Sequence, residues 1–300
     1  MAIDVKELMA KVGKIQLLTR RLVDDELSGE YQSSFKGQGI EFDEVRAYVP
    51  GDDVRSIDWN VTARTGYPHV KRYAEERELT MLFLVDVSGS QGFGSRDRPK
   101  SELAALLACV LAMVAVRNED NVGLIGFSDR IVKTVPARKG RTAVMRLVRD
   151  MLAMEGTRHG TDIAAALRFL NNAQKRRALV FVISDFQAPD FEHELRTTLH
   201  RHDVVALAVD DPAESALPDV GIVEMEDSET GGLFTVDTSS RAVRDAFAAN
   251  AAAARDARTR LFHRIGVDSE AFLTTDSDDA VLAKIRGLFA RRAYHEGRRS

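Results

Sequence analysis

Four short apolar runs recur along the chain, at residues 79–85, 122–127, 178–183 and 204–209. Runs of this length without polar alternation are typical of strands that are covered on both faces. Between them lie segments with helical periodicity, at 103–116, 142–151 and 162–170. Because buried strands alternate with helices, the sequence predicts an α/β fold with a doubly wound, mostly parallel sheet and helices on both faces.

The remaining segments are predicted from weaker patterns. Apolar residues between 5 and 18 recur at three- and four-residue spacing, which predicts an N-terminal helix. Residues 28–64 are rich in Gly, Asp and Arg and contain turn signals, so we expect loops and short strands there. Further predictions are an exposed strand at 70–76, an antiparallel neighbour of the second buried strand at 131–135, a final edge strand at 233–236 and a long Ala-rich helix at 240–264.

These patterns divide the chain into three predicted parts. Residues 1–68 form an N-terminal helix and a Gly/Asp/Arg-rich segment that packs on the main domain. Residues 69–275 form the main α/β domain, and residues 276–300 form a C-terminal helix and tail.

Composition excludes several classes of protein. The net charge of -4 over 300 residues argues against a dedicated nucleic-acid or polybasic membrane-binding protein. The longest uncharged apolar run, 103–116, is shorter than the ~20 residues that cross a bilayer. The N-terminus mixes charges into its apolar positions, unlike a signal peptide, so we expect a soluble cytoplasmic protein. The single cysteine, Cys109, lies in an apolar run and is predicted to be a buried reduced thiol.

Polar side chains gather where the predicted strands end. Asp86, Ser88 and Ser90 follow the first buried strand, Asp185 follows the third, and Thr161 precedes the helix that leads into the third. Because the carboxyl ends of parallel strands meet at one edge, these residues offer two carboxylates and three hydroxyls at one place. A set of oxygen ligands suits a hard divalent cation, and we predict Mg²⁺ (or Mn²⁺).

The same five residues carry a family resemblance. "DVSGS" at 86–90, Thr161 and Asp185 resemble the metal-ion-dependent adhesion site (MIDAS) of von Willebrand factor A domains, in the same order along the chain. The resemblance implies that Ser88, Ser90 and Thr161 contact the metal, while Asp86 and Asp185 orient water around it. It further implies one open coordination position for an acidic residue of a protein partner.

A second resemblance covers residues 37–64, "GQGIEFDEVRAYVPGDDVRSIDWNVTAR". This segment, followed by a von Willebrand A-like domain, resembles bacterial proteins grouped as domain-of-unknown-function family 58. Members of that family are commonly encoded beside MoxR-type AAA+ ATPases, which implies such an ATPase as partner.

Seven residues of this segment are predicted to have structural roles. They are Arg46, Gly51, Asp52, Asp53, Arg55, Asp58 and Trp59. We interpret "PGDD" at 50–53 as a Pro-Gly turn with solvated acids in preference to a second metal site. Arg46, Arg55 and Asp58 are expected to form ion pairs that hold the loop against the main domain. Trp59 is predicted to be a buried packing anchor whose removal costs about 3 kcal/mol or more.

Three functions follow as hypotheses. The leading one is a metal-ion-dependent protein-binding module, not an enzyme, that acts as adaptor or co-chaperone with a MoxR-type ATPase; the chain has no phosphate-binding Gly-x-x-x-x-Gly-Lys-Ser/Thr motif of its own. The alternative is a Mg-dependent phosphoryl-transfer enzyme that uses a strand-end aspartate, although Ser88 stands where such a phosphatase has its second acid. The third is a structural scaffold with a vestigial metal site.

Overall fold

The computed structural model describes residues 5–35, 41–74, 78–92, 98–154, 160–226 and 232–296. The chain divides into two units. The larger unit comprises residues 1–35 and 79–300, and the smaller unit comprises residues 36–78.

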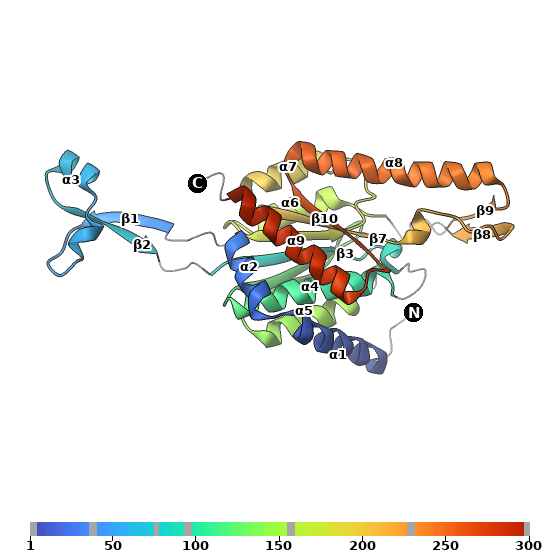
Figure 1. Ribbon diagram of the computed structural model, residues 1–300, viewed down its shortest axis with the longest axis horizontal. Helices are drawn as coiled ribbons and strands as arrows, with labels where there is room; N and C mark the ends of the chain where they lie inside the picture. The colour runs from blue at the N-terminus through green and yellow to red at the C-terminus, as the bar shows by residue number, and fades with distance from the viewer. Residues whose placement is uncertain are drawn as a thin grey trace. The chain divides into compact units, whose positions relative to one another are not determined.

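A six-stranded sheet forms the centre of the larger unit (Figure 1). Its order is β10-β7-β6-β3-β4-β5, and the strands span Asp268–Leu273, Asp203–Asp210, Leu179–Ser184, Thr80–Asp86, Asn121–Phe127 and Ile131–Arg138. All neighbouring pairs are parallel except β4 and β5, which are antiparallel. The predicted α/β fold with a mostly parallel sheet is therefore confirmed, as is the antiparallel strand that follows β4.

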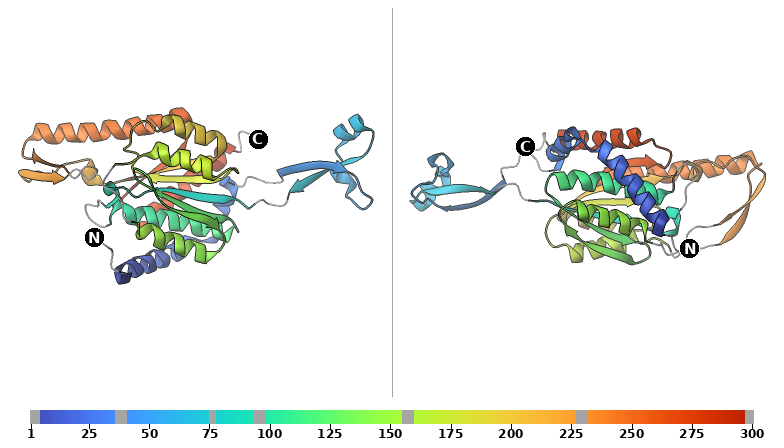
Figure 2. Two further views of the ribbon diagram at one scale, coloured as in Figure 1. Left: turned by 180° about the vertical axis from the view of Figure 1, so that it is seen from behind. Right: turned by 90° about the horizontal axis from the view of Figure 1, so that it is seen from below.

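Helices cover both faces of this sheet (Figure 2). One face packs against α1, α2, α4, α5 and α9, which span Val5–Leu22, Asp25–Phe35, Lys100–Arg117, Arg141–Leu152 and Asp278–Glu296. The other face packs against α6, α7 and the C-terminal end of α8, which span Ile163–Ala173, Glu192–Arg201 and Arg241–Ile265. Within β3, Phe83 faces the first set and Leu84 the second. This double burial explains why the strand sequences are apolar throughout.

Local signals set the ends of several helices. The Asp162 side chain accepts a hydrogen bond from the backbone N–H of Ala165 at 2.7 Å and so caps the start of α6. Gly266, with a φ of 74°, ends α8 in the left-handed conformation that glycine adopts without a steric penalty. Cys109 lies inside α4 and is buried, and burial raises the pKa of its thiol to about 11. The prediction of a buried thiol is confirmed.

Helix α2 was not predicted, because residues 28–64 read as loops and short strands. Its buried residues include Leu27 and Tyr31, and the Tyr31 hydroxyl donates to Oδ2 of Asp120 at 2.9 Å. The other oxygen of Asp120, Oδ1, accepts from the backbone N–H of Leu79 at 2.9 Å. Tertiary contacts thus stabilise a segment whose own sequence is a weak helix former, with Gly29 in its interior.

The predicted edge strand at 233–236 is a strand, but it does not belong to the central sheet. It is β9, Leu233–Asp237, and it pairs antiparallel with β8, Ile222–Glu226, in a separate hairpin. The edge position of the sheet belongs to β10, which runs parallel to β7 and had no prediction. The long helix predicted after residue 240 is confirmed as α8.

The smaller unit contains an antiparallel pair, β1 (Glu41–Ala47) and β2 (His69–Ala74), and the short helix α3 (Trp59–Thr65). The structure therefore divides the chain at 35/36 and 78/79, and not at the predicted 68/69 and 275/276. A boundary at 68/69 would separate β2 from its hydrogen-bonded partner β1. Helices α1, α2 and α9 belong to the larger unit because their apolar faces contribute to its core.

Across the described residues, no helix combines the length and the apolar character that spanning a membrane requires.

Candidate functional site at the strand ends

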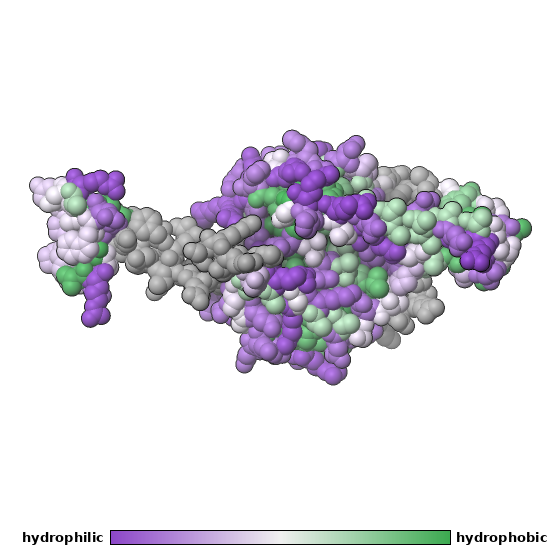
Figure 3. Space-filling model, turned by 45° about the horizontal axis from the view of Figure 1, so that its top comes forward, coloured by the Kyte–Doolittle hydropathy of each residue, from purple (hydrophilic) through white to green (hydrophobic). Residues whose placement is uncertain are grey.

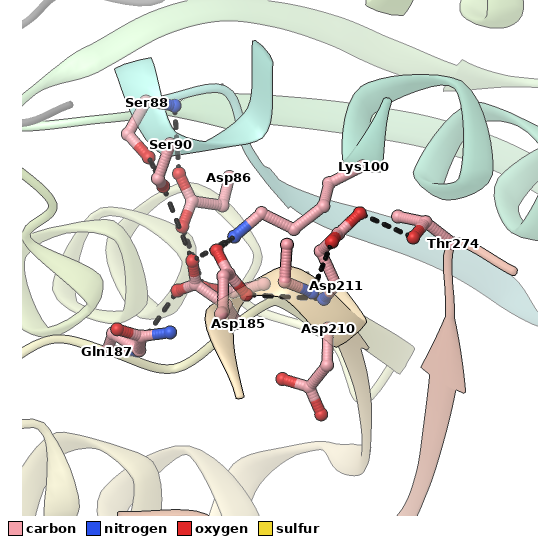
Figure 4. Close-up of polar contacts among 12 residues, drawn as sticks. Asp86, Ser88, Ser90, Lys100, Asp185, Gln187, Asp210, Asp211 and Thr274 are labelled. Atoms are coloured by element: carbon pink, nitrogen blue, oxygen red, sulfur yellow. Dashed lines mark hydrogen bonds and ion pairs between the residues drawn. The ribbon is translucent and has the colours of Figure 1, made fainter. Parts of the chain in front are cut away.

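The carboxyl ends of β3 and β6 lie side by side. These two strands are parallel neighbours, with Val85 opposite Ile183. Asp86 is the last residue of β3, and Asp185 follows the last residue of β6. The sheet order therefore brings together two carboxylates that are almost a hundred positions apart in sequence, as predicted for the metal site (Figure 4).

Asp86 is a buried carboxylate that is held by neutral donors. Its side chain is 2% exposed. Oδ1 accepts from the backbone N–H of Ser88 at 2.9 Å, and Oδ2 accepts from the Ser184 hydroxyl at 2.7 Å. Burial and the nearby charge of Asp185 raise the pKa of Asp86 to about 6. Among the described residues, no cationic side chain forms an ion pair with Asp86.

The two serines continue this network toward Asp185. A 3₁₀ turn at Gly89–Gly92 follows β3 and places the hydroxyls of Ser88 and Ser90 3.0 Å apart. The Ser90 hydroxyl donates to Oδ2 of Asp185 at 3.3 Å, and Oδ1 of Asp185 accepts from the backbone N–H of Gln187 at 3.0 Å. Four of the five predicted ligands, Asp86, Ser88, Ser90 and Asp185, are thus linked by hydrogen bonds through one another or through adjacent backbone (Figure 4).

Thr161 is the exception among the predicted ligands. It is half-buried and lies directly before α6, on the loop whose next residue, Asp162, donates its backbone N–H to the carbonyl of Ser128 at 2.8 Å. Ser128 follows β4, the neighbour of β3, so the loop belongs to the same end of the sheet. In the part of the chain that the structure describes, no hydrogen bond joins Thr161 to the other four residues.

Lys100 is a site residue that the sequence-based prediction missed. It is the first residue of α4, and its side chain is fully buried. Its Nζ donates to Oδ2 of Asp185 at 2.8 Å and to Oε1 of Glu214 at 2.5 Å. Burial alone would lower the pKa of Lys100, but the charges of Asp185 and Glu214 outweigh that effect and raise it. The helix predicted from the apolar pattern begins at residue 103, so the position of Lys100 in the first turn of α4, where it opposes the helix dipole, was not visible in the sequence.

Ser184 was also missed, although it directly precedes Asp185. It is fully buried, and its hydroxyl both donates to Asp86 and accepts from the backbone N–H of Phe186 at 3.0 Å. Phe186 has a φ of 57°, in the left-handed region, so the chain turns sharply after β6. The Ser184 hydroxyl thereby joins this turn to the Asp86 carboxylate.

A second layer of polar contacts surrounds Asp185. Arg258 of α8 makes a bidentate ion pair with Asp210 at 2.8 and 2.6 Å and donates to the carbonyl of Asp185 at 2.7 Å. The Thr274 hydroxyl after β10 donates to Oδ2 of Asp211 at 2.6 Å. Arg258 of α8 therefore links Asp185 to the end of β7, and the contact between Thr274 and Asp211 links the ends of β10 and β7.

A groove of about 800 Å³ opens beside the cluster. Its lining includes the polar residues Ser90, Asp185 and Glu214. It also includes apolar side chains of the β8–β9 hairpin and α8, among them Phe234 and Phe247. Figure 3 shows apolar side chains at the surface of the hairpin, where Ile222, Leu233 and Phe234 are exposed. The groove thus joins a polar cluster to an apolar surface.

The donor chemistry of the cluster fits a divalent cation in part. Within the described residues, no three His, Cys, Asp or Glu side chains are grouped so as to hold a metal ion. The cluster instead combines two carboxylates with two hydroxyls, and the carboxylate of Asp86 has no counter-charge. These are ligands that Mg²⁺ and Mn²⁺ accept. The Lys100 ammonium, however, already pairs with Asp185.

The "PGDD" segment is a turn, as predicted. Gly51 has a φ of 111°, and the backbone N–H of Asp52 donates to the carbonyl of Val49 at 3.0 Å. The Asp52 carboxylate pairs with Arg46 at 2.8 and 2.6 Å, and this contact lowers the pKa of Asp52. Asp53 caps the following 3₁₀ turn, accepting from Arg55 N–H at 2.9 Å.

Asp58 and Trp59 lie at the start of α3. Asp58 caps α3, accepting from the backbone N–H groups of Asn60 and Val61 at 2.9 and 3.2 Å. Trp59, the first residue of that helix, is 70% exposed, so its own unit does not bury the ring, and the predicted packing role stays a prediction. The guanidinium of Arg55 is exposed and forms no ion pair with any described residue. The expected Arg46 ion pair is present, but it lies within the smaller unit.

The chain is similar to known proteins over most of its length. The model of the family described as "Protein of unknown function DUF58" matches residues 44–257. An uncharacterized protein of Mycobacterium tuberculosis is 36% identical over 258 residues, which cover 84% of this chain and 80% of the relative.

Solved structures that resemble the chain include two proteins from different sources. The conserved hypothetical protein BatB from Bacteroides thetaiotaomicron is 16% identical, with a TM-score of 0.44, and the likeness covers 72% of this chain and 99% of BatB. Proximal thread matrix protein 1 from the mussel byssus, with a zinc-occupied MIDAS motif, is 16% identical, with a TM-score of 0.35, and the likeness covers 44% of this chain and 38% of that one.

Proposed function

The chain belongs to the DUF58 family, and from that membership and the strand-end geometry we propose that it is a metal-ion-dependent protein-binding module. One observation carries the proposal: the carboxylates of Asp86 and Asp185 and the hydroxyls of Ser88 and Ser90 converge at the edge of the sheet, beside an open groove. Loops at this edge of a parallel sheet are where such folds bind ligands.

Each residue of the cluster has a role in the proposal. Ser88, Ser90 and Thr161 are the direct ligands of Mg²⁺ or Mn²⁺. Asp86 and Asp185 orient the water around the ion, since both are already fixed by hydrogen bonds from backbone N–H groups. When bound, the ion supplies positive charge at the mouth of the groove, where an acidic side chain of a partner completes its coordination.

The charges around the groove explain why the ion favours binding of a partner's acid. Asp185, Asp210, Asp211 and Glu214 line the groove together with Arg255 and Arg258, and Lys100 pairs with Asp185 and Glu214. The four acids outnumber these three cations, so a bound divalent ion would favour the approach of a carboxylate. The apolar side chains of the hairpin and α8 supply the rest of the contact, because burying them on a partner is favourable.

The partner in the proposal is a MoxR-type AAA+ ATPase. The chain would act as its adaptor or co-chaperone, and the ATPase would supply the energy of nucleotide hydrolysis. This function involves no catalysis by the chain itself. A binding function also fits the environment of Asp86 better than phosphoryl transfer does. Both Asp86 oxygens accept hydrogen bonds, and the buried carboxylate is a poor nucleophile.

Calorimetric titration with Mn²⁺ tests the metal site. We expect saturable binding to the wild-type chain and its loss in Asp86→Ala, because the water shell of the ion loses its anchor. Asp245→Ala is the matched control: it removes the same charge from an exposed position on α8 and should bind as wild type does. Equal Mn²⁺ binding by Asp86→Ala and wild type would contradict the assignment, provided circular dichroism shows both folded.

Partner binding needs a second measurement. The MoxR-type ATPase of the same organism is immobilised, and association of the chain is followed in Mg²⁺ and then in EDTA. We expect association that EDTA reverses and that Asp86→Ala lacks. Association that persists in EDTA would separate partner binding from the metal.

A further inference from the structure

A buried ammonium borders the proposed metal site at Asp185. Lys100 is fully buried, and its Nζ contacts one oxygen of Asp185 (Figure 4). The same Nζ contacts one oxygen of Glu214. A lysine is rarely buried unless acidic partners compensate its charge. These two carboxylates therefore hold Lys100 at the start of α4, where the helix dipole would favour an anion.

The oxygen that binds Lys100 belongs to the predicted coordination network. Oδ2 of Asp185 accepts from Nζ of Lys100 at 2.8 Å and from the Ser90 hydroxyl at 3.3 Å. A divalent ion at Ser90 would be oriented by this same oxygen. Two cations that share one carboxylate oxygen repel each other strongly at such distances inside a protein.

Lys100 forms a second ion pair, with Glu214. Glu214 lies at the wall of the groove, and its side chain is 24% exposed, against 4% for Asp185. The Lys100 side chain can therefore release Asp185 while it retains Glu214, which keeps the ammonium paired. When a divalent ion replaces the ammonium at Asp185, Lys100 loses its ion pair with Asp185 but keeps the one with Glu214.

We propose that Lys100 is a resident cation of this site, which occupies Asp185 in competition with the divalent ion and so sets the affinity for metal. Binding of the ion requires Lys100 to leave Asp185. This inference rests on the metal-dependent function proposed above. Lys100 then determines when the site binds the divalent ion. A partner contact that draws Lys100 toward Glu214 would favour metal binding.

Calorimetric titration of Mn²⁺ into Lys100→Met tests the competition. Removal of the ammonium leaves Asp185 free for the ion, so we expect the dissociation constant for Mn²⁺ to fall at least about tenfold relative to wild type. Lys284→Met is the control for loss of a paired lysine, because the part-buried Lys284 forms an ion pair with Asp276, which is not a predicted ligand. Its affinity should stay within about twofold of wild type.

Lys100→Gln covers the case in which Lys100→Met does not fold. Glutamine can still donate hydrogen bonds to Asp185 and Glu214 but carries no charge, so its affinity for Mn²⁺ should also rise. Equal or weaker binding by the folded Lys100 variants, with wild-type binding still abolished by Asp86→Ala, would overturn the competition and leave the metal site standing. Failure of wild type and both Lys100 variants to bind Mn²⁺ would overturn the metal site itself and the competition with it.

Discussion

At the scale of single residues, hydrogen bonds and charge determine what the strand-end cluster can bind. Asp86 is held by two neutral donors, whereas Asp185 is shared between a hydroxyl and an ammonium. A carboxylate with only neutral donors has no counter-charge when it is ionised, whereas one paired with lysine has. The two acids of the cluster are therefore unequal, and an incoming cation meets uncompensated charge at Asp86 and a competitor at Asp185.

Trp59 gives a residue-scale prediction in the smaller unit. Because its side chain is 70% exposed, Trp59→Ala should change the free energy of unfolding by no more than about 0.5 kcal/mol. Denaturant unfolding monitored by circular dichroism measures this. As Trp59 is the single tryptophan of the chain, its fluorescence in the wild type should also be readily quenched by acrylamide. A loss of several kcal/mol, or a protected indole, would show that the ring is buried.

At the scale of elements, close contact between strands limits which residues the sheet accepts. β4 carries glycine at positions 123 and 126 between apolar residues. A Cβ added at Gly123 would lie 2.9 Å from the backbone nitrogen of Ala137 in β5 and 2.9 Å from Cδ2 of Leu82 in β3. These neighbours come from both sides, so the glycine is required by the approach of the strands and not by its φ.

Gly123→Ala should therefore destabilise the protein by about 1–3 kcal/mol, because the backbone of β5 cannot move aside without disturbing the pair. Gly287→Ala is the comparison. In α9 the nearest atom to an added Cβ is the guanidinium nitrogen NH1 of Arg291 at 3.5 Å, and alanine is the better helix former, so stability should rise by about 0.5–1 kcal/mol. Chemical denaturation measures the free energy of unfolding of both variants, which should fall for Gly123→Ala and rise for Gly287→Ala. The same change in both variants would contradict the close contact at Gly123.

At the scale of the whole molecule, the larger unit contains everything that its sheet and core require. Both apolar clusters consist of residues outside 36–78, and in the described residues β1 pairs with β2 alone. The chain passes from the larger unit into the smaller one after residue 35 and returns at residue 79. Asp120 links the segments on either side, because it accepts hydrogen bonds from the Tyr31 hydroxyl and from the backbone N–H of Leu79. A short connection can therefore replace the smaller unit.

We predict that the larger unit folds without residues 36–78. They are replaced by a Gly/Ser linker of about ten residues, whose root-mean-square span is about 17 Å. The variant should unfold cooperatively and bind Mn²⁺ as the full chain does, because every residue of the cluster lies in the larger unit. Thermal unfolding and calorimetry, with the full chain as control, measure both. An insoluble or non-cooperative product would mean that the smaller unit contributes to the fold.

The sequence by itself determined the buried strands, the helices between them and four converging site residues. Apolar runs report that a strand is covered on both faces, and parallel strands end at one edge whatever their exact order. Asp86 ends such a strand, and Ser88, Ser90 and Asp185 come shortly after such strands, so their meeting could be predicted. The identity of the family was also readable, because the motif at 37–64 is long.

Only the tertiary structure decided which distant side chains complete the cluster. Lys100 reaches Asp185 across 85 positions, and Glu214 joins it from the turn after β7. Likewise, β10 and not β9 occupies the sheet edge, and Trp59 is exposed although tryptophan is usually well buried. A local pattern reports how strongly a residue avoids water, but it does not specify its neighbours. Those are set by the order of the strands and by which helix packs on each face.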